Sequence, residues 1–87
     1  MNESVLNDVR RTAADVLRQP IALVPASATR DSVPGWDSLA HVNLVLALEQ
    51  QFHLQFVPEE MMEMLSIELI AMLIEEKLAA GGRAAGR

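Results

Sequence analysis

One serine of this sequence is placed where its hydroxyl could be chemically modified. Ser38 follows Gly35, Trp36 and Asp37, where a proline-rich stretch gives way to apolar residues at helical spacing. Backbone N–H groups in the first turn of a helix lack intrahelical partners and attract negative charge, so a serine there could hold a phosphodiester. Asp37 or Ser38 could also be only a helix cap, because both residue types accept hydrogen bonds from those N–H groups. Taken alone, these residues favour the cap over a modification site.

No other group of residues predicts catalysis or metal binding. The chain has no cysteine, which excludes a thiolate nucleophile, a disulfide framework and a Cys-ligated metal site. The two histidines, His41 and His53, are too far apart in the sequence to form a pair of ligands on one helix. A glycine-rich phosphate loop is also missing. We therefore expect a protein that is not an enzyme and that binds no metal.

The composition predicts one small domain. The chain has 87 residues, of which 51% are hydrophobic, enough for a folded core. Only three residues are aromatic, so the core is expected to be aliphatic. The N-terminus lacks the apolar region of a signal peptide, and the apolar runs are too short to span a membrane. A cytoplasmic protein that does not contact membranes is expected.

The charges are distributed unevenly along the chain. The formal net charge is −5, and nine acidic residues but no Lys or Arg lie between Asp31 and Glu76. Such a surface repels nucleic acid and favours basic partners. A solvated acidic surface that only maintains solubility is the alternative explanation.

The first half of the chain predicts two helices joined by a long loop. Apolar residues at helical spacing predict an amphipathic helix over about 3–18, which Pro20 ends. Residues 19–37 contain three prolines and a glycine and predict an ordered loop of functional importance. A second helix is predicted from about Ser38 to Gln51.

The second half predicts one short helix and one longer helix. Pro58 followed by two glutamates is typical of a helix start. Ser66 is a candidate cap for the last helix, which the apolar spacing extends to about Leu78. Residues 81–87 are expected to form a flexible tail after a domain of residues 1–80. The predicted fold is all-α, a small four-helix bundle of three main helices and one short helix.

The second predicted helix carries two apolar stripes. The stripe expected to face the core contains Leu44, Leu48 and Phe52. The other stripe, rotated around the helix, contains Leu39, Val42 and Leu46. A domain this small cannot bury both stripes completely. The second stripe is therefore either a half-buried edge of the core or an exposed contact patch.

The sequence from Pro34 to Leu78 resembles the acyl carrier protein family, whose signature is an Asp-Ser-Leu triplet that opens the second helix. The matching features follow one another in order along the chain: Asp37-Ser38-Leu39, the apolar residues of the second helix, Leu54 and Phe56, Pro58-Glu59-Glu60, and Ser66-Ile67. The triplet is weak evidence by itself, whereas the triplet with this spacing is strong. The resemblance implies an acyl carrier protein-like bundle with a long loop between its first two helices.

The resemblance also implies a cofactor. Ser38, flanked by Asp37 and Leu39, would be esterified by the phosphate of 4′-phosphopantetheine, which a separate phosphopantetheinyl transferase takes from coenzyme A. The thiol of this arm would hold acyl groups as thioesters in a fatty-acid-like, polyketide or other specialised pathway. A chain without cysteine agrees with this, because the reactive sulfur then comes with the cofactor.

Two further sets of residues take their expected roles from the resemblance. The surface facing partner enzymes would contain Leu39, Val42, Leu46, Glu49, Glu59 and Glu60. These partners would load, condense or transfer acyl groups and would present basic or apolar docking surfaces to a monomeric carrier. The lining of an acyl pocket would contain Phe56, Met61 and Met64, although Met61, Met62 and Met64 could equally be ordinary core and rim residues.

The sequence also departs from the family pattern. Ala40 and Asn43 replace acidic residues that are typical of fatty-acid carriers, which suggests dedicated partners. His41 is expected to be solvated on the exposed face of the helix. Trp36 would either cover the arm or a partner, or pack against the loop.

Two alternatives to an acyl carrier remain open. A carrier of aminoacyl or peptidyl groups uses the same arm and a similar fold. A helical interaction module, in which Ser38 is only a cap, would carry no arm.

Overall fold

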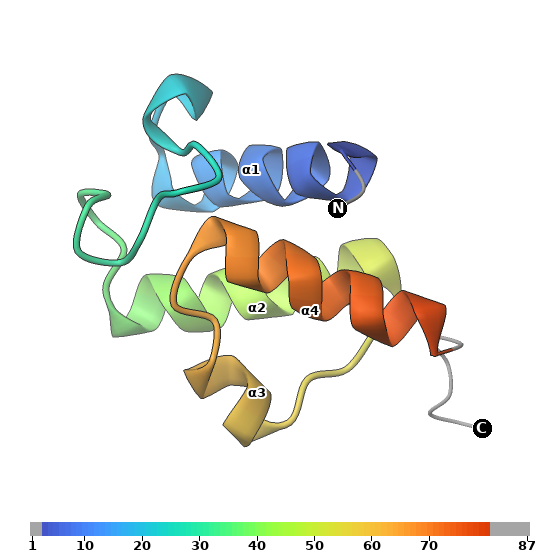
Figure 1. Ribbon diagram of the computed structural model, residues 1–87. Coiled ribbons are helices and arrows are strands. Elements are labelled where there is room, and N and C mark those ends of the chain that lie inside the picture. The colour runs from blue at the N-terminus through green and yellow to red at the C-terminus, as the bar shows by residue number, and fades with distance from the viewer. Residues whose placement is uncertain (1–2, 81–87) are drawn as a thin grey trace.

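The structure, a computed structural model, describes residues 3–80, which form four α-helices and one short 3-10 helix (Figure 1). The helices are α1 (Glu3–Leu17), η1 (Ile21–Leu23), α2 (Ser38–Phe52), α3 (Pro58–Met62) and α4 (Ile67–Ala79). The predicted all-α bundle with one short helix and a long loop before α2 is confirmed. The predicted tail, residues 81–87, lies outside the described part of the chain.

Local sequence sets the beginnings of the last two helices. The Ser66 hydroxyl accepts a hydrogen bond from the Leu69 N–H at 3.1 Å and caps α4, as predicted. At α3, Pro58 occupies the first turn and the Glu60 carboxylate accepts from the N–H of Val57 at 3.0 Å. Both contacts satisfy N–H groups that a helix start would otherwise leave without a partner.

The helices α1 and α2 end with the same backbone conformation. Arg18 and His53 have left-handed backbones, with φ of 57° and 56°. The residue after each turns back, so that Gln19 N–H bonds the Ala14 carbonyl at 3.0 Å and Leu54 N–H bonds the Glu49 carbonyl at 3.1 Å. The helix α1 thus ends before Pro20 rather than at it.

The core is aliphatic and is formed mainly by the three long helices α1, α2 and α4. The helix α1 contacts both of the others. Figure 1 shows α3 on the side of the bundle away from α1. The residues with no exposed surface include Val9 of α1, Leu44 and Leu48 of α2, and Ile67, Ile70 and Ile74 of α4. The core stripe predicted on α2 is therefore confirmed for Leu44 and Leu48, while Phe52 is half-buried.

The long loop between α1 and α2 is held to the bundle at several points. The Arg10 guanidinium of α1 donates to the Val24 carbonyl at 2.8 Å. Further along the loop, the Ala28 carbonyl accepts from Ile67 N–H at 3.0 Å, at the start of α4. Val24, Ala28 and Trp36 are buried. These contacts fix the path of the loop and therefore the position of the first turn of α2.

The two apolar stripes of α2 predict different responses to truncation. Leu48→Ala should lower the free energy of unfolding by about 2–5 kcal/mol, because it opens a cavity in the core. Leu46→Ala, on the same helix but with 51% of its surface exposed, should change it by about 0.5 kcal/mol or less. Urea unfolding followed by circular dichroism measures both values. Equal losses in the two variants would contradict the assignment of the stripes.

Candidate functional site

Ser38 is the first residue of α2, and its side chain is exposed. Asp37 acts as the N-cap, since its Oδ1 accepts from the Ala40 N–H at 2.8 Å. The capping role is therefore filled by Asp37, and the Ser38 hydroxyl does not perform it. The Oγ of Ser38 instead lies 3.4 Å from Nη2 of Arg30, at the outer limit of hydrogen-bonding distance.

An apolar hollow of about 320 Å³ adjoins this hydroxyl. Its lining comes from the loop, the first turns of α2, and α3: Arg30, Ser38, His41, Val42, Pro58, Met61 and Met62. Of the three residues predicted to line an acyl pocket, Met61 lies here. Phe56 and Met64 do not line this hollow, because they are buried in the core with 8% and 1% of their surfaces exposed. Met62 was missed by the sequence reasoning, since only the fold shows that the exposed side of α3 faces the start of α2.

The expectation of a solvated His41 is wrong. His41 is 6% exposed and Trp36 is 4% exposed. The indole N–H of Trp36 donates to Nδ1 of His41 at 3.0 Å, and the rings are stacked. The spacing did carry a signal for this burial, since His41 lies three and four residues before the buried Leu44 and Val45. The partners that satisfy the imidazole could not be read in this way, because they come from the preceding loop and from α3.

The second nitrogen of His41 reaches α3. Its Nε2 lies 3.1 Å from the backbone carbonyl of Met61. An indole nitrogen can only donate and a carbonyl can only accept, so these partners require the neutral imidazole with its hydrogen on Nε2. Trp36 therefore packs inside the loop, and the Trp36–His41–Met61 chain of hydrogen bonds ties the loop, α2 and α3 together at the edge of the hollow.

The second stripe of α2 forms an exposed apolar face. Leu39, Val42 and Leu46 have 70%, 43% and 51% of their surfaces exposed. This face begins directly after Ser38 and follows α2 for two turns. The spacing left open whether this stripe is a half-buried edge of the core or an exposed patch. The structure agrees better with an exposed patch.

The three glutamates predicted to face partners differ in how they are engaged. Glu59 is exposed. Glu49 accepts from the N–H of Phe56 at 2.9 Å, and Glu60 binds the Lys77 ammonium at 2.9 Å as well as the N–H of Val57. The Glu49 carboxylate thus holds the segment between α2 and α3, residues 53–57, which is called the link before α3. The Glu60 carboxylate also bonds this link and joins α3 to α4.

The Glu60 contacts change its acidity. Burial alone would raise the pKa of Glu60, but the hydrogen bond from Val57 N–H and the Lys77 ammonium together lower the pKa below its ordinary value of 4.5. The carboxylate is therefore favoured in the folded state.

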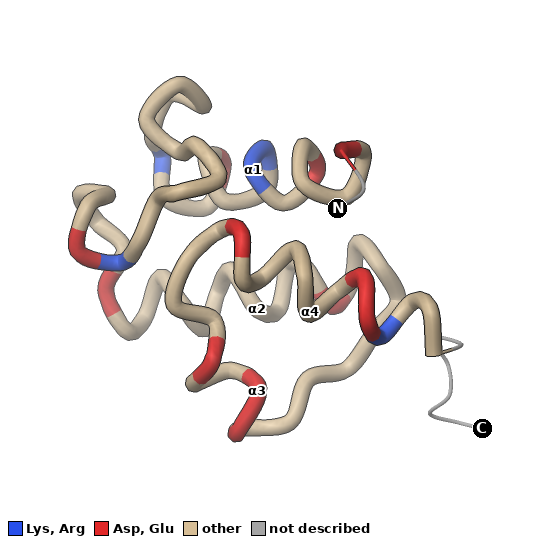
Figure 2. Tube along the Cα trace, viewed as in Figure 1, with Lys and Arg blue, Asp and Glu red and all other residues tan. Residues whose placement is uncertain are grey.

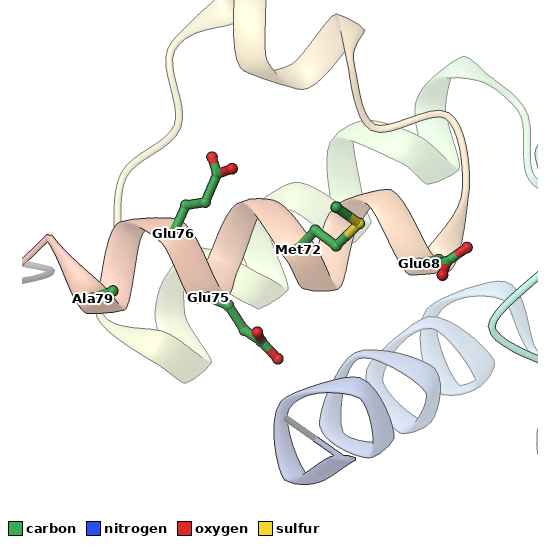
Figure 3. A pocket seen from close by; sticks show the side chains of 5 residues that line it. All are labelled: Glu68, Met72, Glu75, Glu76 and Ala79. Atoms are coloured by element: carbon green, nitrogen blue, oxygen red, sulfur yellow. The ribbon is translucent and has the colours of Figure 1, made fainter. Parts of the chain in front are cut away.

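Acidic residues lie on α1, α3 and α4, whereas Arg10, Arg11 and Arg18 are grouped on α1 and the residue after it (Figure 2). Another hollow lies on α4 and is lined by Glu68, Met72, Glu75, Glu76 and Ala79 (Figure 3). It includes none of the predicted site residues. Within residues 3–80, no group of three or more His, Cys, Asp or Glu side chains is arranged to hold a metal ion. None of the helices described between Glu3 and Ala79 has the length and apolar character needed to cross a membrane.

Comparison with known proteins supports one family. No protein-family model matches the chain. The chain is 30% identical over 81 residues to "Acyl carrier protein 3" of Ralstonia nicotianae, and the match covers 93% of each sequence. The helical bundle, with an Asp-Ser-Leu triplet opening its second helix, agrees with this similarity. The chain belongs to the acyl carrier protein family, as the resemblance of its motif predicted.

The Glu60 ion pair predicts a dependence of stability on pH. Because the folded state lowers the pKa of Glu60, its contribution is present above the ordinary value of 4.5 that the carboxyl has in the unfolded chain. The contribution is lost as the pH falls through the folded-state value. Near neutral pH, Glu60→Gln should therefore have a lower urea midpoint than the wild type. At about pH 3, the midpoints of the two proteins should be close to each other. The same substitution at exposed Glu59 is the control, and an equal effect there would contradict a specific role of the Lys77 contact.

Proposed function

We propose that this protein carries acyl groups as thioesters on a 4′-phosphopantetheine arm attached to Ser38, and that it is not itself an enzyme. The observation that supports this most is the exposed Ser38 hydroxyl, which opens α2 beside an apolar hollow in a member of the acyl carrier protein family. A phosphopantetheinyl transferase would join Ser38 Oγ to the phosphate of the arm, while the hydroxyl proton and the nucleotide part of coenzyme A leave. When attached, the arm supplies the thiol that forms the thioester.

The residues around Ser38 fit such an attachment. The Asp37 carboxylate caps the helix, so modification of Ser38 removes no capping hydrogen bond. The Trp36–His41 hydrogen bond holds the loop against α2, so the attachment point has a fixed position. Because the chain has no cysteine, the thiol of the arm would have no competing protein thiol.

The predicted acyl pocket would need the bundle to open. Met61 and Met62 line the hollow beside Ser38, whereas Phe56 and Met64 are buried in the core and do not line it. An acyl chain that follows the hollow would meet the two methionines first. It would reach Phe56 and Met64 only if α3 moved away from α2, and flexible methionine side chains can repack around such a guest.

Partner enzymes would dock mainly through apolar contacts next to the arm. Leu39, Val42 and Leu46 are exposed beside the attachment point. Ala40 and Asn43 provide no charge on the same helix, and Glu49 is already bonded to the link before α3. We infer that enzymes that load, condense or transfer the acyl group recognise an apolar face with the acidic Glu59 nearby. This composition fits dedicated partners in a specialised pathway.

The remaining alternatives differ in what the arm carries or whether it is present. The similarity to a relative named an acyl carrier protein favours acyl groups over aminoacyl or peptidyl groups. Loading with acyl- and aminoacyl-adenylating enzymes separates these two cargoes. The mass measurement on Ser38 described next distinguishes a carrier from an interaction module that carries no arm. The expectations of a monomer and of a cytoplasmic location stay predictions.

Attachment at Ser38 predicts a defined gain in mass. Incubation with coenzyme A and a broad-specificity phosphopantetheinyl transferase should add one phosphopantetheine to the wild type, as measured by intact-protein mass spectrometry. Ser38→Ala should abolish this gain while its circular dichroism spectrum stays helical, because the exposed hydroxyl contributes little to the fold. Ser27→Ala, at an exposed position of the preceding loop, is the control and should still be modified. A wild type that gains no mass would leave the interaction module as the better explanation.

The apolar face predicts a docking defect that is separate from the fold. Val42→Asp should reduce the efficiency of modification by the transferase about tenfold or more, because it places a charge in an apolar contact. Gln50→Asp adds the same charge at an exposed position farther along α2. The transferase should modify this variant at the wild-type rate. The initial rates are measured at several carrier concentrations. Equal rates for both variants would place Val42 outside the interface with this partner.

A further inference from the structure

Arg30 is isolated among acidic residues and lies next to the proposed attachment point. It is the only Lys or Arg between residues 19 and 76. Its Nη2 is 3.4 Å from Ser38 Oγ, and both residues line the apolar hollow. The sequence separation of eight residues gives no sign of this proximity, because the turn of the loop creates it.

The backbone around Arg30 is fixed by hydrogen bonds. Arg30 is the second residue of a turn in which the Ser32 N–H donates to the Thr29 carbonyl at 3.0 Å and the Thr29 N–H donates to the Ser32 hydroxyl at 2.8 Å. Thr29 also forms an isolated antiparallel bridge with Ser66 at the start of α4. The guanidinium therefore extends toward Ser38 from a defined position and not from a free loop.

Two arginines of α1 have protein partners that Arg30 lacks. Arg10 donates to two loop carbonyls, and Arg11 pairs with Asp8. Among residues 3–80, no carboxylate forms an ion pair with Arg30. Its neighbour in the sequence, Asp31, makes no such contact, and the Asp37 carboxylate is directed to the Ala40 N–H. The Arg30 guanidinium thus retains donors that no carboxylate of residues 3–80 uses, beside the one hydroxyl that the proposed function modifies.

We propose that Arg30 binds the phosphate of the phosphodiester formed on Ser38 and so sets the direction in which the arm leaves the protein. This inference rests on the proposed function. Esterification of Oγ adds two nonbridging phosphate oxygens that share one negative charge, and they lie two bonds from the Oγ atom that Nη2 already approaches. A guanidinium donates two parallel hydrogen bonds to such a group, whereas an ammonium acts as a point charge.

The contact would have two consequences for the carrier. Asp37, the residue before Ser38, carries a negative charge that repels a phosphodiester, and Arg30 offsets this repulsion at close range. Because Arg30 lines the same hollow as Val42, Met61 and Met62, a phosphate bound to it holds the base of the arm at the mouth of the hollow. Arg30 is a positioning residue in this proposal and takes no part in bond formation.

Phosphorus NMR of the loaded protein tests the contact directly. One attached arm gives one phosphodiester resonance, so the signal needs no assignment. Wild type, Arg30→Gln, Arg30→Lys and the control Arg11→Gln are each loaded to completion with the transferase, and intact mass verifies the loading. In the wild type, added sodium chloride should shift and narrow the resonance, because salt screens an exposed ion pair. Arg30→Gln should abolish this salt dependence, Arg30→Lys should retain part of it, and Arg11→Gln should match the wild type.

A second readout follows the guanidinium itself. The Arg30 Nε–H resonance of ¹⁵N-labelled protein should shift when the arm is attached, and the Arg11 resonance should not. Circular dichroism verifies the fold of each variant, and the lysine variant keeps the test valid if the glutamine variant is unstable. Identical phosphorus spectra for fully loaded wild type, glutamine and lysine variants would overturn the role of Arg30 while leaving the arm on Ser38. Absence of the arm from the wild type would overturn the proposed function and this inference with it.

Discussion

The hydrogen bond from Trp36 to His41 determines how the start of α2 meets the rest of the bundle. It joins the last residues of a long loop to a buried imidazole, whose other nitrogen reaches the Met61 carbonyl of α3. An unpaired polar group at this depth costs about 1–3 kcal/mol, so each of the three partners depends on the others. Ser38 lies between Trp36 and His41 in the sequence, and its exposed hydroxyl is therefore presented from a rigid support.

The same helix serves two purposes because its faces differ. Leu44 and Leu48 fill the core, while Leu39 and Val42 are exposed beside Ser38. A core of this size leaves part of a largely apolar helix uncovered, and an uncovered apolar face is typical of an interaction surface. The acidic residues contribute in different ways, since Glu60 joins α3 to α4 through Lys77. Structural roles and the proposed recognition roles are thus divided between residues that composition alone would group together.

The fold could be predicted from the sequence because its signals are local. Apolar spacing, prolines and the Ser66 cap each depend on a few neighbouring residues, and they gave the helices and the core stripe of α2 correctly. His41 lies at helical spacing with the buried Leu44 and Leu48, but the groups that satisfy its nitrogens could not be predicted, because they are a loop residue and a distant carbonyl. The approach of Arg30 to Ser38 was missed for the same reason. Long-range contacts made by irregular backbone leave no periodic pattern in a sequence.

The most direct test of the proposed carrier role is to locate the arm within the chain. The protein contains five serines, and only Ser38 combines an exposed hydroxyl with the start of α2 and the adjoining hollow. After modification with coenzyme A, proteolysis and tandem mass spectrometry should find the phosphopantetheine on the peptide that contains Ser38 and on no other peptide. An arm found on a different serine, or a Ser38 peptide that stays unmodified with a transferase active on other carriers, would contradict the assignment.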